Sequence, residues 1–409
     1  MAPPSGRLGH NSGNAAAERR PGETAMRDDA KGVEIHRGLR GVYFDRTATT
    51  FIDGRAGELR YRGYSIHDLA RHSTFEETAC LLLDGELPTR DRLDAFDAEL
   101  KAGRTLPQPI YQLIDAIRHA HPMTVLRTAV SALAAFDDEA ADNSPEATLR
   151  KGLRLIAQVP IIVTAHHHIR NGRAPVPASP TLGHAANFLY MLKGEPPSAD
   201  AAKVMDVDMV LHAEHGSNAS SFTARVVAGT DAELYAAATA AVAALSGPAH
   251  GGAAENVMRM AKEIGDPGRA AEYVRRKRRN REPVTGFGHR VYRAEDPRAR
   301  HMRDAVERLS REMGQPHWYQ ILAAVVEAMR PYARHGVNVN VDFYAGVVYY
   351  LHGIPEDLFV SIFAIGRVPG WTRQVLDQLE KNILIRPLLH YTGPGPRDYV
   401  PIERRTRSA

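Results

Sequence analysis

The sequence predicts an almost wholly α-helical protein with one small β-hairpin near its N-terminus, and three observations support this prediction. Most segments after Ser65 carry apolar residues at the three-and-four spacing of an amphipathic helix. Glycine, proline or asparagine interrupts that spacing between the segments. Only the stretch from Phe51 to Tyr61 has short β-prone runs around an Asp53-Gly54 pair, a pattern typical of a hairpin.

The helical elements follow in order along the chain. Residues 1–30 lack an apolar period and are expected to form a disordered tail. Val337, Val339 and Val341 alternate with polar residues, which indicates a short extended segment. The expected helices are 67–83, 90–102, 109–119, 124–137, 146–169, one from Ser198 or Asp200 to Gly216, 235–246, one after Gly252 to Ile264, 318–329 ended by Pro331, 343–351, 357–365 and 371–379.

The bulk composition bounds the class of protein. A chain of 409 residues is long enough for two domains and a large core. The net charge of +4 mildly favours anionic partners. The single cysteine, Cys80, lies in an apolar run and cannot form an internal disulfide. The sequence contains no apolar run of membrane-spanning length and no signal-peptide core, so we expect a cytoplasmic protein.

One stretch, Gly286 to Arg298, gathers an imidazole, arginines and a helix start in thirteen residues. Glycines near His289 let the backbone approach a ligand closely. Asp296 is a good N-cap residue, and Pro297 suits a first helical turn. Guanidinium groups beside a helix N-terminus favour an anion. A polar loop before a helix is the simpler alternative.

Five further side chains are candidates for chemistry, and each also has a purely structural interpretation. His215 is predicted on the last turn of a helix, where the dipole favours a histidine. His250 follows a Gly-Pro break and is open to a role as a turn residue. Asp342 precedes a helix and is a candidate N-cap. Arg367 and Arg386 stand next to glycine or proline and fit surface positions.

Taken together, these positions resemble the motifs of the citrate synthase family. The matching segments occur in the family's order and spacing: 211–216, 250–252, 286–298, 340–344 and 383–387. The resemblance covers nearly all of the chain after residue 31. It implies a Claisen-type condensation of acetyl-CoA with oxaloacetate, followed by thioester hydrolysis to citrate and CoA.

The resemblance assigns the catalytic roles. Asp342 corresponds to the base that removes a proton from the acyl methyl carbon, and a water-poor cleft makes a carboxylate a stronger base. His250 corresponds to the donor that stabilises the enolate oxygen, and its place before a helix N-terminus favours a neutral imidazole. His289 corresponds to the acid that protonates the ketone oxygen of oxaloacetate.

The binding residues come from the same resemblance. The matches to the oxaloacetate-binding positions are His215, Arg298, Arg367 and Arg386. Arg386 corresponds to a residue that reaches the partner subunit's site, which implies a homodimer. Arg293 matches a position that contacts a CoA phosphate.

The resemblance also implies a domain organisation. We expect a large helical domain from residues 31–251 and 355–409, a small helical domain from 252–354, and the active site in the cleft between them. The extra N-terminal regulatory domain of larger relatives is not expected. No cofactor is implied, since the CoA thioester is a substrate. No metal site is expected, because adjacent residues of the His166–His168 triplet point in different directions on a helix.

Two alternatives stay open. A 2-methylcitrate synthase would use propionyl-CoA, and one methylene is worth only about 1–3 kcal/mol of discrimination. Departures from the family pattern at Ala249, Ala254 and Gly366 lie near the substrate pockets and leave this choice undecided. From another class, the pI of 9.1 and the basic run Arg275–Arg281 fit a non-enzymatic helical protein that binds anions or nucleic acid.

Overall fold

The computed structural model describes residues 26–28 and 33–405, and the chain divides into two units. The first unit combines residues 1–46 with 386–409. In it, β1 (Met26–Asp28) pairs antiparallel with β2 (Val33–Ile35). Strand β1 falls inside the tail that was predicted to be disordered, so that prediction is wrong for these three residues. The remainder of the predicted tail lies outside the described residues.

The second unit, residues 47–385, is almost wholly helical, as predicted. Its one sheet has the order β3–β4–β5, formed by Thr50–Asp53, Glu58–Tyr61 and Tyr64–Ser65. Thr50 lies opposite Tyr61 and Asp53 opposite Glu58, so the predicted hairpin around Asp53-Gly54 is confirmed. The described helices are α1 Ile66–His72, α2 Phe75–Asp84, α3 Arg90–Ala102, α4 Gln108–Ala116, α5 Pro122–Leu133, α6 Pro145–Arg170, α7 His184–Lys193, α8 Ala199–His212, α9 Ala219–Ala228, α10 Leu234–Leu245, α11 Ala253–Ile264, α12 Ala270–Arg279, α13 Ala299–Glu312, α14 His317–Ala333, α15 Asp342–Leu351 and α16 Phe359–Glu380.

Two predicted helix breaks at proline are wrong. Pro331 lies inside the last turn of α14, and Pro369 lies inside α16, which joins the two helices predicted at 357–365 and 371–379. A proline removes one backbone hydrogen bond and crowds the preceding turn, which costs about 3 kcal/mol in an isolated helix. Burial compensates in α16, because its residues from Phe359 to Thr372 are all buried.

The reverse error occurs at residues 67–83, where one predicted helix is two. Helix α1 ends at His72, and α2 begins at Phe75. The hydroxyl group of Thr74 accepts a hydrogen bond from the Glu77 N–H and caps the second helix. The apolar spacing continues through this position and therefore does not reveal the break. The capping threonine starts a new helix there.

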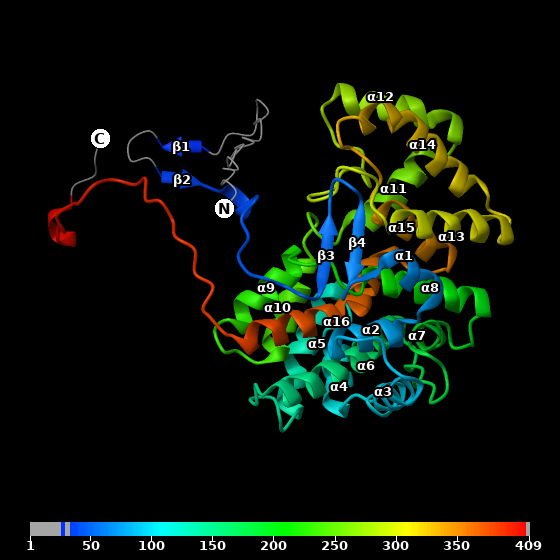
Figure 1. Cartoon of the computed structure of the whole chain (residues 1–409), viewed down its shortest axis with the longest axis horizontal. Coiled ribbons are helices and arrows are strands. Elements are labelled where there is room, and N and C mark those ends of the chain that lie inside the picture. The colour runs from blue at the N-terminus through cyan, green and yellow to red at the C-terminus, as the bar shows by residue number, and fades with distance from the viewer. Residues whose placement is uncertain (1–25, 29–32, 406–409) are drawn as a thin grey trace, which may run out of the picture. The chain divides into compact units, whose positions relative to one another are not determined.

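Helix α16 is the centre of the core. It packs against α2, α6, α8, α9 and α10, and Figure 1 shows it running among these helices. Helices α11 to α15 form a second group, in which α15 packs against α11 and α13, and α12 packs against α14. Gly152 of α6 allows one close crossing, because a Cβ there would lie 2.2 Å from Thr372. Among the described residues, no helix is long and apolar enough to cross a membrane.

Cys80 lies in α2 and is fully buried. Burial, with a contribution from Asp84, raises the pKa of its thiol to about 12. A thiol that stays protonated is a poor nucleophile. Cys80 therefore behaves as a small apolar core residue, as the sequence indicated.

Candidate active site

The loop that carries His289 is tied to the segment that leads into Asp342. A β-bridge joins Phe287 to Val339 within the segment predicted to be extended, but Val341 at its end already has helical backbone angles. The turn before the bridge needs glycine, because Gly286 has a φ of +82° in the left-handed region. The predicted acid and the predicted base therefore stand on two backbone segments that are bonded to each other.

The β-hairpin holds the same loop from its other side. The carbonyl oxygen of Gly54, in the hairpin turn, accepts a 2.6 Å hydrogen bond from the Arg293 N–H. A Cβ at Gly54 would lie 2.3 Å from the carbonyl oxygen of Val291, so only glycine permits this approach. The Arg293 side chain remains exposed and accessible to a ligand.

His289 is held in one tautomer by the backbone. Its Nδ1 accepts hydrogen bonds from the N–H groups of Val291 at 3.0 Å and Tyr292 at 3.1 Å. Burial, reinforced by the positive charge of Arg298, lowers the pKa of the imidazole to about 4. The ring is therefore neutral near pH 7 and carries its proton on Nε2. This nitrogen is a hydrogen-bond donor that no described residue occupies.

His215 lies in the loop after α8, because the helix ends at His212 and not at Gly216 as predicted. Its buried ring lies 5.2 Å from the ring of His289, and its Nε2 lies 3.1 Å from the Tyr292 hydroxyl. Burial, with Arg298 as the next cause, lowers the pKa of His215 well below its usual range. His215 and His289 thus form one wall of neutral imidazoles.

Asp296 binds Arg298 and is not the N-cap of α13, which begins at Ala299 without a side-chain cap. Its carboxylate accepts bonds from Nε of Arg298 at 3.0 Å and Nη2 at 2.8 Å. Both side chains are buried. Burial acts to raise the pKa of Asp296, but the charge and hydrogen bonds of Arg298 outweigh it and lower the pKa. The Nη1 side of the guanidinium is left for a second carboxylate.

His250 points at the N-terminus of α9. Its Nε2 accepts a hydrogen bond from the Ser220 N–H at 3.2 Å, and a backbone N–H can only donate. Burial, with a contribution from Arg367, lowers the pKa of His250 to about 4. The neutral ring therefore carries its proton on Nδ1. The sequence predicted a neutral donor here but attributed it to the following helix, α11.

Asp342 is the first residue of α15, and its side chain makes no hydrogen bond to a described residue. An N-cap carboxylate would accept a bond from the first turn, so the capping interpretation is not supported. Burial raises the pKa of Asp342 above its usual value, although His212 and Arg298 act in the opposite direction. The carboxylate is thus free to accept a proton and is a stronger base than in water.

Arg367 is buried inside α16, not on the surface. Its Nε donates a hydrogen bond to the carbonyl oxygen of His212. Burial lowers the pKa of its guanidinium to about 10, which still leaves it charged near pH 7. Its guanidinium carbon lies 4.7 Å from the centre of the Phe363 ring.

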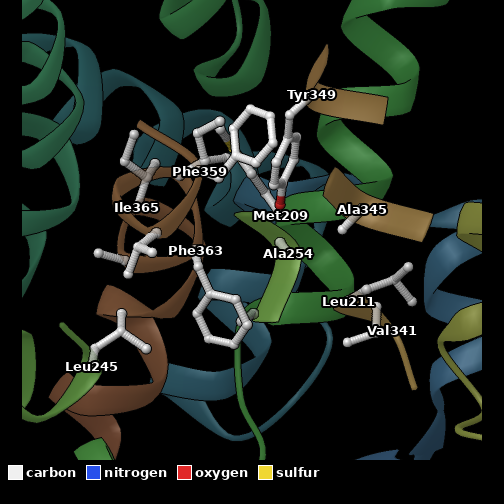
Figure 2. Close-up of a cluster of buried hydrophobic side chains, with 14 of the residues drawn as sticks. Met209, Leu211, Leu245, Ala254, Val341, Ala345, Tyr349, Phe359, Phe363 and Ile365 are labelled. Atoms are coloured by element: carbon white, nitrogen blue, oxygen red, sulfur yellow. The ribbon is translucent and has the colours of Figure 1, made fainter. Parts of the chain in front are cut away.

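Phe363 connects several of these groups. Its ring centre is 6.4 Å from that of His250 and 4.5 Å from that of His212. Figure 2 shows Phe363 projecting from α16 among side chains of α8, α11 and α15. The structure thus gathers the predicted residues His215, His250, His289, Arg298, Asp342 and Arg367 around one region of the second unit.

Arg386 is not among the residues that the structure gathers. It belongs to the first unit, and its side chain is exposed in the extended segment after α16. The basic run Arg275–Arg281 lies largely on α12. Arg276 pairs with Glu263 at 2.5 Å and Lys277 with Glu282 at 2.6 Å, as on a solvated helix surface. Within residues 26–28 and 33–405, no cluster of His, Cys, Asp or Glu has a geometry that holds a metal ion.

Three contributing residues were missed or misread from the sequence. Tyr292 lies within the Gly286–Arg298 stretch, but no sequence pattern predicts its hydrogen bond to His215. Ser220 fixes the tautomer of His250 from thirty positions away. Asp296 was read as a helix cap, and its carboxylate in fact orients Arg298.

Comparison with known proteins identifies the family. The family model for the citrate synthase C-terminal domain matches residues 38–388. A citrate synthase from Deinococcus radiodurans is 43% identical over 374 residues, covering 91% of this chain and 99% of the relative. The 2-methylcitrate synthase 1 of Corynebacterium glutamicum is 38% identical over 382 residues, again covering 91% and 99%. The citrate synthase from Thermoplasma acidophilum, solved as a ternary complex with carboxymethyl coenzyme A and oxaloacetate, superimposes with a TM-score of 0.86 at 31% identity. The match covers 91% of this chain and 100% of that chain. On the strength of this match along its length, the chain belongs to the citrate synthase family.

Proposed function

We propose that the protein condenses acetyl-CoA with oxaloacetate and hydrolyses the resulting thioester, giving citrate and CoA. One combination of groups carries this proposal. The carboxylate of Asp342 makes no hydrogen bond to a described residue, and two neutral imidazoles offer an N–H each, His250 from Nδ1 and His289 from Nε2. A carbon acid needs a base, and the oxygen on each side of the new bond needs a hydrogen-bond donor.

The proposed steps use these three groups in turn. Asp342 removes a proton from the methyl carbon of the acyl group, and the Nδ1–H of His250 donates to the enolate oxygen. The enolate carbon then attacks the ketone carbon of oxaloacetate. The Nε2–H of His289 passes its proton to the ketone oxygen as the carbon–carbon bond forms. Each such donor is worth roughly 3 kcal/mol of the barrier.

Oxaloacetate carries two carboxylates, and guanidinium groups bind carboxylates in a bidentate manner. Arg298 offers the side that Asp296 leaves free, Arg367 lies against Phe363, and His215 provides a further polar contact. Arg386 is proposed to complete the site from the partner subunit of a homodimer. Arg293, exposed beside the hairpin, is proposed to contact a phosphate of CoA.

We further propose that residues 252–354 form the small domain and close over the substrates. Closure would exclude water while the enolate exists and readmit it for thioester hydrolysis. The reaction as proposed needs no metal or cofactor, because proton transfers and hydrogen bonds supply every step. A cytoplasmic location and a homodimer remain predictions.

The choice of acyl-CoA is the second part of the proposal. Relatives named citrate synthase and 2-methylcitrate synthase match the chain at similar identity, which supports propionyl-CoA as an alternative substrate. The test is steady-state CoA release with acetyl-CoA and propionyl-CoA side by side, each with and without oxaloacetate. Release that does not depend on oxaloacetate would contradict the condensation.

The non-enzymatic alternative has no support among the relatives, which are named as enzymes. A salt-dependent DNA-binding titration separates the two classes directly. DNA affinity without oxaloacetate-dependent CoA release would favour the binding protein.

A further inference from the structure

The loop between α8 and α9 contains a buried carboxylate, that of Glu214, which has no part in the proposed steps. Glu214 is next to His215 in the chain and is 0% exposed. Its Oε2 accepts hydrogen bonds from the Gly216 N–H at 2.5 Å and from the Thr50 hydroxyl group. Its Oε1 accepts a 2.9 Å bond from Nε2 of Gln374. Donors from three separate segments of the chain therefore satisfy this desolvated carboxylate.

The amide of Gln374 has one orientation that suits its neighbours. Its oxygen lies 3.3 Å from Nη1 of Arg225, and a guanidinium group can only donate. The NH2 group must therefore face Glu214. Arg225 and Gln374 are both buried, so neither exchanges this bond for one to solvent. Glu214 thus meets an N–H donor at each of its two oxygens, and an amide side chain at position 214 cannot accept from both.

The two peptide groups that flank His215 are each held by a hydrogen bond. The Tyr61 hydroxyl donates a 2.7 Å bond to the carbonyl oxygen of Glu214, in the peptide group before His215. The Glu214 carboxylate accepts from the N–H of Gly216, in the peptide group after it. Gly216 has a φ of +56°, in the left-handed region that favours glycine. The turn that carries His215 is therefore fixed on both sides.

The β3–β4 hairpin connects this turn to the Gly286–Arg298 stretch (Figure 1). Its first strand contributes Thr50, whose hydroxyl group bonds the Glu214 carboxylate. Its turn contributes Gly54, whose carbonyl oxygen accepts the bond from the Arg293 N–H. One small element thus contacts both of the loops that carry histidines of the proposed site.

We propose that Glu214 is a positioning residue for oxaloacetate binding, because its carboxylate fixes the turn that holds the His215 imidazole in the site. The imidazole lies 3.1 Å from the Tyr292 hydroxyl and 5.2 Å, between ring centres, from His289. Both distances depend on the turn, since the ring is attached to backbone that Glu214 and Tyr61 hold. The inference deepens the proposed function and rests on it, because His215 is there a contact of oxaloacetate.

The first test is the steady-state CoA release of Glu214→Gln with saturating acetyl-CoA. The new amide brings an N–H against the N–H of either Gly216 or Gln374, so the turn shifts. We expect KM for oxaloacetate to rise about tenfold and kcat to stay within about threefold, because His215 holds the substrate and the transition state alike. A purely structural role would lower the active fraction, and thus kcat, with KM unchanged. That result would overturn the inference.

A double-mutant cycle tests whether Glu214 acts through His215. His215→Ala alone should raise KM at least as much as Glu214→Gln does. In the His215→Ala background, Glu214→Gln should change KM by less than about twofold, because the group that it positions is gone. Losses that multiply in the double variant would show that Glu214 acts by another route, and would overturn the inference.

The fixed amide of Gln374 offers a rescue experiment. In the double variant Glu214→Gln, Gln374→Glu, the amide introduced at position 214 can accept from the Gly216 N–H and donate to the carboxylate at position 374, which still accepts from Arg225. The net charge is unchanged, and KM should return to within about threefold of the wild type. A double variant that binds oxaloacetate as weakly as Glu214→Gln alone would contradict the assignment.

Thr50→Val keeps the experiment decisive if Glu214→Gln does not fold. This variant retains the carboxylate and removes only one of its donors. KM for oxaloacetate should rise about fivefold, and kcat should again stay within about threefold. An unchanged KM would count against the inference.

Glu76→Gln is the matched control. Glu76 is also a buried carboxylate, 8% exposed, and accepts a 2.5 Å bond from a backbone N–H, that of His184. This N–H begins α7, which contributes no residue to the proposed site. KM should stay within about twofold of the wild type, and a rise equal to that of Glu214→Gln would overturn the inference. A wild type without oxaloacetate-dependent CoA release would instead refute the proposed function, whereas every other outcome leaves that function intact.

Discussion

The pair formed by Asp296 and Arg298 gives a prediction whose size can be worked from the contacts. The carboxylate accepts bonds from the Arg298 N–H at 3.1 Å, Nε at 3.0 Å and Nη2 at 2.8 Å, and from the Val341 N–H at 3.4 Å. Asp296→Asn removes the charge and turns an N–H donor toward the guanidinium. Hydrogen bonds to charged groups contribute about 1.5–3 kcal/mol each. Breaking one partner of a buried pair costs about 3–5 kcal/mol.

We therefore expect Asp296→Asn to lower the free energy of unfolding by about 4 kcal/mol, measured by urea denaturation with circular dichroism. Asp304→Asn is the control on the following helix, because Asp304 pairs with Arg303 at 3.5 Å and is 72% exposed. An exposed pair contributes less than about 1 kcal/mol. Equal losses in the two variants would refute the assignment of a stabilising buried pair.

The same pair also predicts a pH dependence. Its interactions lower the folded-state pKa of Asp296, so the stabilisation is present above the unfolded value of about 3.9 and is lost as the pH falls through the folded pKa. The stability difference between wild type and Asp296→Asn should shrink on acidification. A difference that grows below about pH 4 would contradict this account. The double variant Asp296→Leu, Arg298→Met should recover much of the stability, yet bind oxaloacetate weakly, which separates folding from function.

Three further predictions follow from the proposed site. Asp342→Asn should lower kcat by about a thousandfold and leave oxaloacetate affinity, measured by calorimetry, within about threefold of the wild type. An equal loss of kcat and affinity would favour a structural role. The pKa values of about 4 for His250 and His289 keep both rings neutral above about pH 5. Neither ring should therefore cause a change in kcat/KM near pH 6.5 in the pH profile. A change at that pH that disappears in His250→Gln would contradict the neutral-donor assignment. Arg386→Leu should raise KM for oxaloacetate about tenfold to a hundredfold, whereas Arg397→Leu in the same exposed tail should not. A protein that sediments as a monomer and releases CoA with full activity would rule out a contribution of Arg386 across an interface.

Local patterns account for much of what the sequence predicted correctly. The Asp53-Gly54 turn and its flanking β-prone runs determine the hairpin, because a short turn and its neighbours carry the whole signal. The apolar period predicted most helices for the same reason. His289 and Arg298 were placed together correctly because only nine positions separate them.

Errors arose where packing between distant segments decides the outcome. Pro369 is accommodated in α16 because the helix is buried on all sides, which no local pattern encodes. His250 is oriented by Ser220 on a different helix, and the link exists only after α9 packs into the core. Asp296 has the spacing of a helix cap, but a buried guanidinium two residues away competes successfully for its carboxylate.

The bridge between Phe287 and Val339 has a consequence for how specificity can change in this family. The bridge links the segments that carry His289, the proposed proton donor, and Asp342, the proposed proton acceptor. Main-chain hydrogen bonds, and not the substrate, therefore set the separation between these two residues. Gly366 and Phe363 belong to α16 and take no part in that bridge. Substitutions on α16 can therefore change the groups around the site without breaking the main-chain link between the two reacting residues.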